Sequence, residues 1–314
     1  GVGFKLVRPR LTPDVKKLLA RILPVAFGAG LYQVNIVING TIASLIGVGA
    51  VSWIYYADRV NLLPVGIFGY AIGVALLPLL ARQIQAGQED AALGSQNRAI
   101  EVCLLLTLPA AVGIGMLAEP ITATLFEHGQ FTASDRTAVA QALLAFSLGI
   151  PAYVLNKALT PGFFARHDTS TPVKASAAAL FVNVAINLAL MKSLGHVGIA
   201  LGTSISAWVN ATILAVVLRR RGHLVADARL SRRLPRTALA SILMGFALWG
   251  GLIGIGNTLG PVFGLPGMAA GDKLLRVVAL TMLVGGGGLV FAAAAFATGA
   301  AARADLQLLK RRRG

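Results

Sequence analysis

Long apolar segments recur along the whole chain, and they constrain its fold more than any other feature. Each runs for about 18 residues or more, enough for a helix to cross a hydrocarbon core of ~30 Å. Only 13% of the 314 residues are charged, against about 25% in a soluble domain. The roughly ten-residue alternation of outer-membrane barrels is missing, and backbone groups in lipid must pair within their own segment. The sequence therefore predicts an all-α integral membrane protein.

The apolar segments divide into about eight predicted transmembrane helices. Gly47 and Gly49 mark a very short connection between the first two. Glycine is abundant, with 36 residues, as expected where membrane helices pack closely. The predicted spans are residues 20–47, 50–80, 100–118, 137–159, 173–192, 196–218, 237–258 and 274–298.

Basic residues are distributed unevenly between the two sets of connections. If the N-terminus is cytoplasmic, four basic residues fall on outward-facing segments and two lie within spans, which leaves 22 of the 28 on or beside inward-facing segments. Lysine and arginine accumulate on cytoplasmic loops, so we expect both ends of the chain in the cytoplasm. The outward-facing four are Arg136, Lys192, Lys273 and Arg276.

The polar segments divide the chain into five predicted parts. The spacing within residues 81–99 suits either a helix along the cytoplasmic surface or a plain loop, and residues 219–236 form a basic linker. A connection rich in glycine and proline joins the last two spans. The parts are a basic cytoplasmic lead-in (1–19), a six-helix lobe (20–218), the linker (219–236), two further transmembrane helices (237–298) and a basic cytoplasmic tail (299–314).

The second span carries the residues that most strongly indicate a binding site. It contains Asp58 and Arg59, and a charge at the centre of a span costs roughly 2.5–3.5 kcal/mol on insertion scales. Such residues usually face the bundle interior or a water-filled cavity. Pro64 removes a backbone hydrogen bond close to Arg59. Steps of three or four residues predict a cavity-lining face along Tyr55, Arg59, Leu62, Gly66, Gly69 and Gly73.

Two interpretations stay open for each intramembrane cation. Arg59 either projects into a cavity or lies at the outer end of its span and snorkels to the headgroups, with Asp58 as its local neighbour. Lys157 lies near the cytoplasmic end of the fourth span, where it either snorkels or provides a second contact for an anionic substrate.

Polar side chains also recur in the first, fifth and sixth spans. Asn183 and Asn187 are four residues apart and share a helix face. The set suits interhelical hydrogen bonds, worth ~0.6–2 kcal/mol each, or a cation site lined by amide and hydroxyl oxygens. Its members are Asn35, Asn39, Asn183, Asn187, Thr203, Ser204 and Ser206.

Patterns typical of enzymes are weak. The four histidines are scattered through predicted loops without metal-ligand spacing, and Glu101 and Glu119 stand at span ends, where we expect them to be solvated. Cys103 is the single cysteine, so no disulfide can form within the chain. We predict no catalytic residue and no metal. The net charge of +16 mostly flanks spans, where it sets topology and contacts anionic lipids, so no nucleic-acid partner is expected.

Three long motifs carry a resemblance to a known family. They are GAVSWIYYADRVNLLPVGIFGYAIGVALLPLLARQ (49–83), EPITATLFEHGQFTASD (119–135) and ALTPGFFARHDTSTPVK (158–174). In this order they resemble the bacterial lipid II flippases, the MurJ or MviN family of the multidrug/oligosaccharidyl-lipid/polysaccharide exporter superfamily. The last two spans match by placement rather than by motif.

The resemblance implies a fourteen-helix transporter with two six-helix lobes and two extra C-terminal helices. This chain would hold the second lobe and the extra helices, and the first lobe, with several of the family's cationic residues, would be missing. The family's central cavity lies between the lobes, and its cavity arginine falls on Arg59, with Asp58 beside it. We expect Tyr55 and Lys157 as further substrate contacts, and a groove for the lipid tail on the final two helices.

Some members of the family bind sodium through acidic residues in this lobe. The matching positions here are Asn39, Asn183, Asn187 and Thr203, where Asn39 and Asn187 replace carboxylates. Fewer ligand charges offset the dehydration of a cation less well, so we expect a structural role rather than a tight sodium site. Coupling to sodium or to the membrane potential stays open.

The function that follows is translocation of lipid II across the bacterial inner membrane by alternating access, with lipid II and membrane lipids as partners. Another exporter of the same superfamily, for O-antigen lipids or drugs, is the nearest alternative. A membrane enzyme acting on polyprenyl phosphates is a more distant one, because it would need a carboxylate or histidine cluster at one membrane face.

Overall fold

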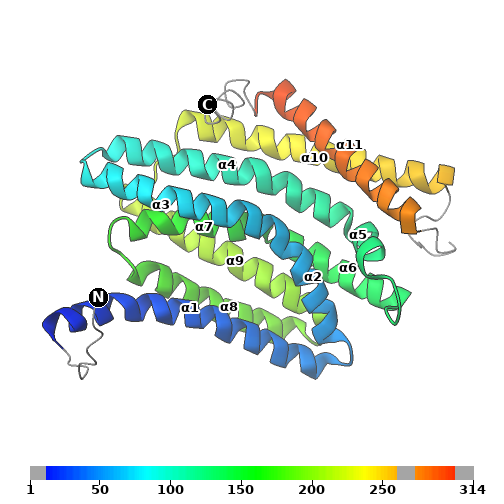
Figure 1. Cartoon of the computed structure of the whole chain (residues 1–314), viewed down its shortest axis with the longest axis horizontal. Helices are drawn as coiled ribbons and strands as arrows, with labels where there is room; N and C mark the ends of the chain where they lie inside the picture. The colour runs from blue at the N-terminus through cyan, green and yellow to red at the C-terminus, as the bar shows by residue number, and fades with distance from the viewer. Residues whose placement is uncertain (1–11, 260–272, 301–314) are drawn as a thin grey trace, which may run out of the picture.

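The structure of the chain is a computed structural model that describes residues 12–259 and 273–300. Within these residues every regular element is a helix, and the helices lie side by side in one bundle (Figure 1). The elements are α1 (Pro13–Ile46), α2 (Ala50–Pro64), the π segment η1 (Val65–Gly69), α3 (Tyr70–Gln85), α4 (Glu89–Met116), α5 (Ala118–Phe126), α6 (Ala133–Ser147), α7 (Ile150–Phe164), α8 (Ser170–Leu190), α9 (Gly195–Arg220), α10 (Ala228–Leu259) and α11 (Lys273–Thr298).

Seven helical segments of the described chain are long and apolar enough to cross a membrane. Two of them are composite: α2, η1 and α3 join into Ala50–Gln85, and α6 and α7 join into Ala133–Phe164. α1 is 34 residues long, and the apolar stretch described in it is Gln33–Ile46. The predicted all-α membrane fold is therefore confirmed: the seven segments correspond to the second to eighth predicted spans, and α1 covers the first.

The helices alternate in direction, which separates the connections into two sets. The turns at 86–88, 165–169 and 221–227 lie at the same end of the bundle as the beginning of α1 (Figure 1). The turns at 47–49 and 191–194 lie at the opposite end. The first end is the one that the lysine and arginine pattern assigns to the cytoplasm.

The two predicted polar connections are shorter in the structure than in the sequence interpretation. Residues 81–99 form neither a surface helix nor a loop, because α3 runs to Gln85, α4 begins at Glu89, and Gly87 at φ +72° closes a tight turn between them. The basic linker shrinks to 221–227, since α10 begins at Ala228. Both helix ends carry polar residues whose pairing within the bundle the sequence does not reveal.

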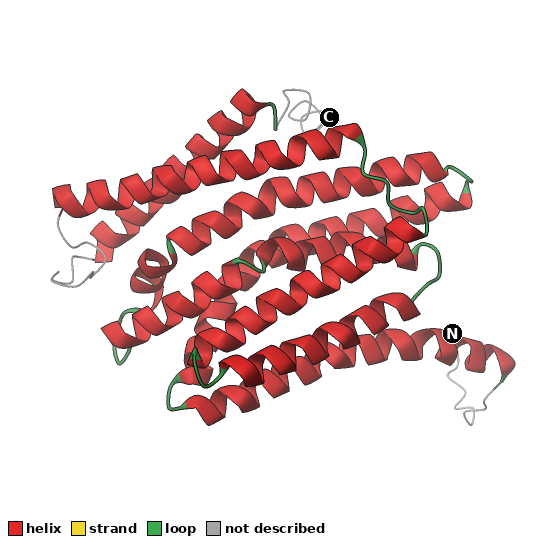
Figure 2. Cartoon of the chain, turned by 180° about the vertical axis from the view of Figure 1, so that it is seen from behind, coloured by secondary structure: helices red, strands yellow, loops and turns green. Residues whose placement is uncertain are grey.

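The last two helices pack on the body through α4, along which α10 lies (Figures 1 and 2). α10 and α11 approach each other closely, because a Cβ at Gly251 would lie 2.9 Å from Leu283 and one at Gly287 would lie 2.8 Å from Leu248. Residues 1–11, 260–272 and 301–314 lie outside the described residues. They hold most of the predicted lead-in, of the connection between the last two spans and of the predicted tail.

Candidate functional site

The second span is a broken helix. α2 passes into α3 through the π segment Val65–Gly69, which begins directly after Pro64. Proline has no N–H, and its ring crowds the carbonyl four residues earlier, so the regular hydrogen-bond ladder is interrupted there. A π turn accommodates the interruption by holding one more residue than an α turn, and such segments are frequent at functional sites. The disturbance expected at Pro64 is present.

Arg59 lies on the exposed side of α2, just before this break. Its guanidinium carbon stands 4.4 Å from the centroid of the Tyr55 ring, within the range of a cation–π contact. No carboxylate of the described residues lies within ion-pair distance of Arg59. Asp58 is half-buried and lies on a neighbouring side of the helix, because successive helix residues do not face each other. In the described residues Arg59 is thus held by a tyrosine ring and not by a direct ion pair.

A second cation, Lys157 of α7, lies against the broken helix. Its Nζ lies 5.1 Å from the centroid of the Tyr70 ring. The lysine stem lies against Gly69, where a Cβ would meet Lys157 Cγ at 3.4 Å. The sequence placed Lys157 two residues from the end of its span, but α7 continues to Phe164, about two turns beyond it. Lys157 therefore stands deeper in the bundle than expected.

An exposed stripe connects the two cations along the broken helix. Beyond Arg59 it follows Leu63, Ile67, Tyr70 and Val74, which are 60–74% exposed and recur at steps of three or four residues. The described chain leaves this face uncovered. Apolar and aromatic side chains with a cation near each end form a surface that suits either a second lobe or an amphipathic ligand.

The predicted stripe through Leu62, Gly66, Gly69 and Gly73 is wrong at its last two positions. Gly69 is buried, and a Cβ at Gly73 would lie 3.5 Å from the backbone oxygen of Lys157. These glycines allow α3 to approach α7, so they serve helix packing and do not line an opening. The exposed stripe runs one residue later than predicted, and the shift already begins at Leu63, before the π segment.

The predicted polar cluster of α1, α8 and α9 is present as a continuous hydrogen-bond network. The Nδ2 of Asn187 donates to the Oδ1 of Asn39 at 2.8 Å and to that of Asn183 at 3.2 Å. Asn39 and Asn183 both donate to the Oγ1 of Thr203 at 3.3 Å. Asn35 donates to Asn183 at 2.9 Å. Asn183 and Asn187 are fully buried, and all five side chains are neutral.

One atom of this network is left over. The Oδ1 of Asn187 is buried without a hydrogen-bond donor in the described chain. It faces Gly202 on α9, where a Cβ would lie only 2.1 Å away. The arrangement satisfies most amides mutually, as interhelical hydrogen bonds require. That the cluster is structural and does not bind sodium tightly stays a prediction.

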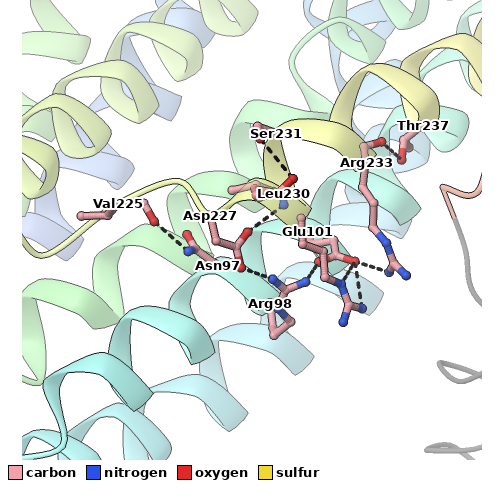
Figure 3. Close-up of polar contacts among 11 residues, drawn as sticks. Asn97, Arg98, Glu101, Val225, Asp227, Leu230, Ser231, Arg233 and Thr237 are labelled. Atoms are coloured by element: carbon pink, nitrogen blue, oxygen red, sulfur yellow. Dashed lines mark hydrogen bonds and ion pairs between the residues drawn. The ribbon is translucent and has the colours of Figure 1, made fainter.

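A buried ion cluster ties α10 to α4 near the end of the bundle that holds the turns 86–88 and 221–227 (Figure 3). The sequence interpretation missed this cluster. Glu101 is only 7% exposed, which corrects the expectation that it is solvated. It pairs with Arg98 on its own helix and with Arg229 and Arg233 on α10. Arg98 also pairs with Asp227. Two features of the sequence indicate this cluster in retrospect. Arg98 and Glu101 are three residues apart on one helix, and arginines lie at the start of α10.

A second ion cluster holds α11 at the opposite end of the bundle. Glu127 accepts Arg136 of α6 at 3.2 Å and Arg276 of α11 at 3.0 Å. Arg276 also donates to the backbone oxygen of Ala123 at 3.3 Å. Glu119 lies 3.5 Å from Arg136, so this acid too is paired rather than free in solvent. The final two helices are therefore fastened to the six-helix body at both ends.

The motif 158–174 shapes the turn between α7 and α8. Asp168 accepts hydrogen bonds from the backbone N–H of Thr171 at 2.9 Å and from its hydroxyl at 2.6 Å, and it pairs with Arg221 at 2.5 Å. Burial by itself raises the pKa of Asp168, but these partners outweigh it and hold the pKa at about 2, below the ordinary 3.8. Arg166 pairs with Glu89 at 2.6 Å. The turn thus joins α8, α9 and α4.

Comparisons with known proteins agree with this architecture. The family model described as "Lipid II flippase MurJ" matches residues 1–269. The probable lipid II flippase MurJ of Rhizobium tropici is 41% identical over 292 residues, which cover 91% of this chain and 55% of the relative. That of Rhizobium meliloti is 45% identical over 248 residues, covering 79% and 46%. The chain spans about half the length of the curated relatives it matches.

Solved structures show the same fold. A lipid II flippase MurJ in an inward closed conformation matches with a TM-score of 0.71 at 21% identity, over 92% of this chain and 56% of that one. An outward-facing multidrug resistance MATE family transporter of the MOP superfamily matches with a TM-score of 0.57 at 17% identity, over 88% and 65%. The resemblance carried by the three motifs is confirmed. Since the family model covers most of its length, the chain belongs to the lipid II flippase MurJ family.

Proposed function

We propose that the complete protein containing this chain moves lipid II, an undecaprenyl-pyrophosphate-linked disaccharide-pentapeptide, across the bacterial inner membrane by alternating access. This chain supplies the second six-helix lobe and the two helices that follow it. A first lobe of the same protein closes the cavity over the exposed stripe of α2 and α3. Both ends of the chain lie in the cytoplasm, in accordance with the distribution of lysine and arginine.

The observation that carries the proposal is the pair of cations on that stripe. A charge exposed to lipid inside a span is costly, so Arg59 and Lys157 require a polar surrounding, which a cavity between two lobes provides. The lipid II pyrophosphate is the matching anion. Arg59 can form two parallel charge-assisted hydrogen bonds with it, while Tyr55 limits the orientations of the guanidinium. Lys157 adds a point charge to the same face.

The final two helices are proposed to carry the polyprenyl tail. α10 and α11 present large exposed apolar side chains, among them Phe246, Trp249, Met282 and Leu289. The ion clusters around Glu101 and Glu127 fasten these helices to the body, so the tail surface moves with the second lobe. An amphipathic substrate is then held by its headgroup and its tail on one rigid unit.

The driving force proposed for transport is the membrane potential rather than sodium. Moving one charge across 100 mV is worth about 2.3 kcal/mol. The asparagine cluster contains no carboxylate to compensate a dehydrated cation, and its amides already bond one another. Beyond membrane lipids, no further partner or cofactor is proposed.

Reconstitution of the full-length protein tests the proposal against its nearest alternative, export of another polyprenyl-linked lipid or of a drug. Vesicles receive lipid II with a fluorescent headgroup or, in parallel, an O-antigen-type lipid with the same pyrophosphate and tail. We expect loss of headgroup accessibility, measured with a membrane-impermeant quencher, for lipid II only. Equal movement of both lipids favours a general exporter, and movement of neither rejects the flippase.

A variant pair ties the activity to Arg59. Arg59→Ala should abolish flipping and fail to support growth of a flippase-depleted bacterium at normal protein levels. Arg59→Lys should retain at most part of the activity, because lysine lacks the planar fork. Arg82→Ala, on the same span but outside the stripe, is the matched control. Normal flipping by Arg59→Ala would remove the pyrophosphate contact from the proposal.

A further inference from the structure

An apolar pocket opens on the outer surface of the bundle, away from the stripe of α2 and α3. Its volume is about 220 Å³, and its walls come from α4, α7, α9 and the connection into α10. Leu104, Leu159 and Ala211 form part of its floor, and the exposed Trp208 stands at its rim. An engineered apolar cavity of about 150 Å³ stays dry and binds benzene. Hydrocarbon rather than water is therefore the natural filling of this pocket.

The connection 221–227, which joins α9 to α10 (Figure 2), contributes part of the pocket wall. Leu224 and Ala226 line the pocket, and between them the backbone oxygen of Val225 accepts a hydrogen bond from Asn97 at 2.7 Å (Figure 3). The next residue, Asp227, pairs with Arg98 and accepts the backbone N–H of Leu230 at 2.7 Å. These contacts hold this part of the pocket wall in place against α4.

A basic residue follows the pocket-lining residues of α9 on the same helix face. Trp208, Thr212 and Ala215 line the pocket at steps of four and three residues, and Arg219 follows four residues later on the same helix face. Arg219 is exposed, and in residues 12–259 and 273–300 it makes no ion pair. It lies at the end of the bundle assigned to the cytoplasm. The phosphates of the cytoplasmic leaflet are expected at this depth.

We propose that the pocket holds one acyl chain of an anionic phospholipid of the cytoplasmic leaflet, with the lipid phosphate against Arg219. The acyl chain fills a void whose lining residues would otherwise lose dispersion contacts. The charge of Arg219 favours a lipid with a negative headgroup. The volume suits part of an acyl chain, and the pocket lining includes no residue of the exposed stripe on α2 and α3. The site is therefore separate from the substrate path and does not depend on what the protein transports.

Photo-crosslinking of the full-length protein in phosphatidylcholine vesicles tests this site. The vesicles contain a small fraction of either phosphatidylglycerol or phosphatidylcholine that carries a diazirine on one acyl chain. After illumination, digestion and mass spectrometry locate the label. We expect severalfold more label from the phosphatidylglycerol probe on peptides containing Trp208 and Leu224. Equal labelling of these peptides by both probes would overturn the proposal.

Matched variants separate the pocket from the general lipid surface. Ala215→Phe fills the pocket and should reduce labelling severalfold, whereas Ala247→Phe, on the exposed side of α10, should not. Arg219→Gln should abolish the preference for phosphatidylglycerol, and its neighbour Arg220→Gln should preserve it. Thr212→Trp, at an exposed position of the pocket wall, serves if Ala215→Phe does not fold. Unchanged labelling in both pocket-filling variants would exclude the pocket as the binding site.

Discussion

Gly202 of α9 lies directly against the amide oxygen of Asn187 on α8: a methyl group on Gly202 would stand 2.1 Å from that oxygen. This contact lets α8 and α9 approach closely enough for the asparagine network to close. Asn187 is not free to move away, because its Nδ2 donates to Asn39 and Asn183. The glycine is therefore required by its neighbour and not by its own backbone conformation.

We predict that Gly202→Ala destabilises the protein. Overpacking a close contact costs typically 1–3 kcal/mol, which outweighs the gain of about 0.5–1 kcal/mol from removing a glycine within a helix. The measurement is the apparent unfolding temperature of the full-length protein in detergent. Gly94→Ala is the control, because a Cβ at Gly94 has nothing within 4 Å and only the helical gain remains. A Gly202→Ala protein as stable as Gly94→Ala would show that the network relaxes at no cost.

Glu101 should be the acid whose charge matters most for fastening α10. It is nearly buried and pairs with arginines on both α4 and α10, so Glu101→Gln leaves the partly buried Arg233 beside a neutral group. Removing one partner of a buried pair costs about 3–5 kcal/mol, and partial exposure of Arg98 and Arg229 places our expectation near the lower limit. Thermal unfolding of the full-length protein measures the loss.

The matched control for Glu101→Gln is Glu89→Gln, which breaks a pair with Arg166 in which the carboxylate itself is exposed. Exposed pairs contribute about 0–1 kcal/mol, so this control should unfold near the parental temperature. Equal effects of the two substitutions would mean that the Glu101 cluster is solvated in the membrane-embedded protein.

The spans were predictable because apolar length is a local property of the sequence. The asparagine cluster was also predictable, from i, i+4 spacing and from the family resemblance. The early start of α4 and of α10 was not, since polar residues such as Glu101 and Arg233 are stabilised there only by each other across two helices. Pairing of this kind is a tertiary property, and residue spacing in one segment does not contain it.

The direction of the binding stripe shows the same limit on a smaller scale. Helical periodicity correctly placed Tyr55 and Arg59 on one face. Further along it predicted Gly69 where Tyr70 is exposed, because Gly69 packs against Lys157 and Val154 of α7. A proline indicates that a helix is disturbed, but the sequence does not say whether the backbone kinks, bulges or adds a residue.

Asp168 should stabilise the turn between α7 and α8 in a pH-dependent manner. Its folded pKa of about 2 lies below the ordinary 3.8, so its contribution is complete above about pH 4 and is lost as the pH falls towards 2. Asp168→Asn should cost about 1 kcal/mol at pH 7 after allowance for solvent screening, and the difference should shrink between pH 4 and pH 2.

Thermal unfolding of the two proteins across this pH range tests the effect. Asp90→Asn, at an exposed position in the first turn of α4, controls for the loss of a carboxylate at a helix end. A stability difference between Asp168→Asn and the parent that stays constant from pH 7 to pH 2 would contradict the assigned role of the ionised carboxylate.

The orientation of the bundle can be tested with single cysteines. The natural Cys103 is fully buried, so it should react little with a membrane-impermeant maleimide. Ser193→Cys and Ser231→Cys are nearly isosteric changes at exposed positions on opposite ends of the bundle. Because arginines crowd the end that holds Ser231, we expect labelling of intact cells at position 193 only. Labelling at position 231 before the membrane is opened would reverse the proposed topology.

The asparagine cluster should not couple transport to sodium. A cation must lose its hydration shell, and Asn39, Asn183, Asn187 and Thr203 provide dipoles but no formal charge to compensate that loss. The opposing argument is the Oδ1 of Asn187, an acceptor without a donor in the described chain. One neutral oxygen is a weak ligand, and the other amide groups would have to give up hydrogen bonds of 2.8–3.3 Å to join it.

We therefore predict that lipid II movement by the reconstituted full-length protein changes less than twofold when sodium is replaced by potassium or choline. Asn39→Asp combined with Asn187→Asp should create a sodium dependence, because two carboxylates supply the missing charge. Asn210→Asp, on α9 but outside the cluster, is the control for a carboxylate added within a membrane span. A severalfold sodium requirement in the unmodified protein would show that the orphaned oxygen of Asn187 and its neutral neighbours suffice to hold the ion.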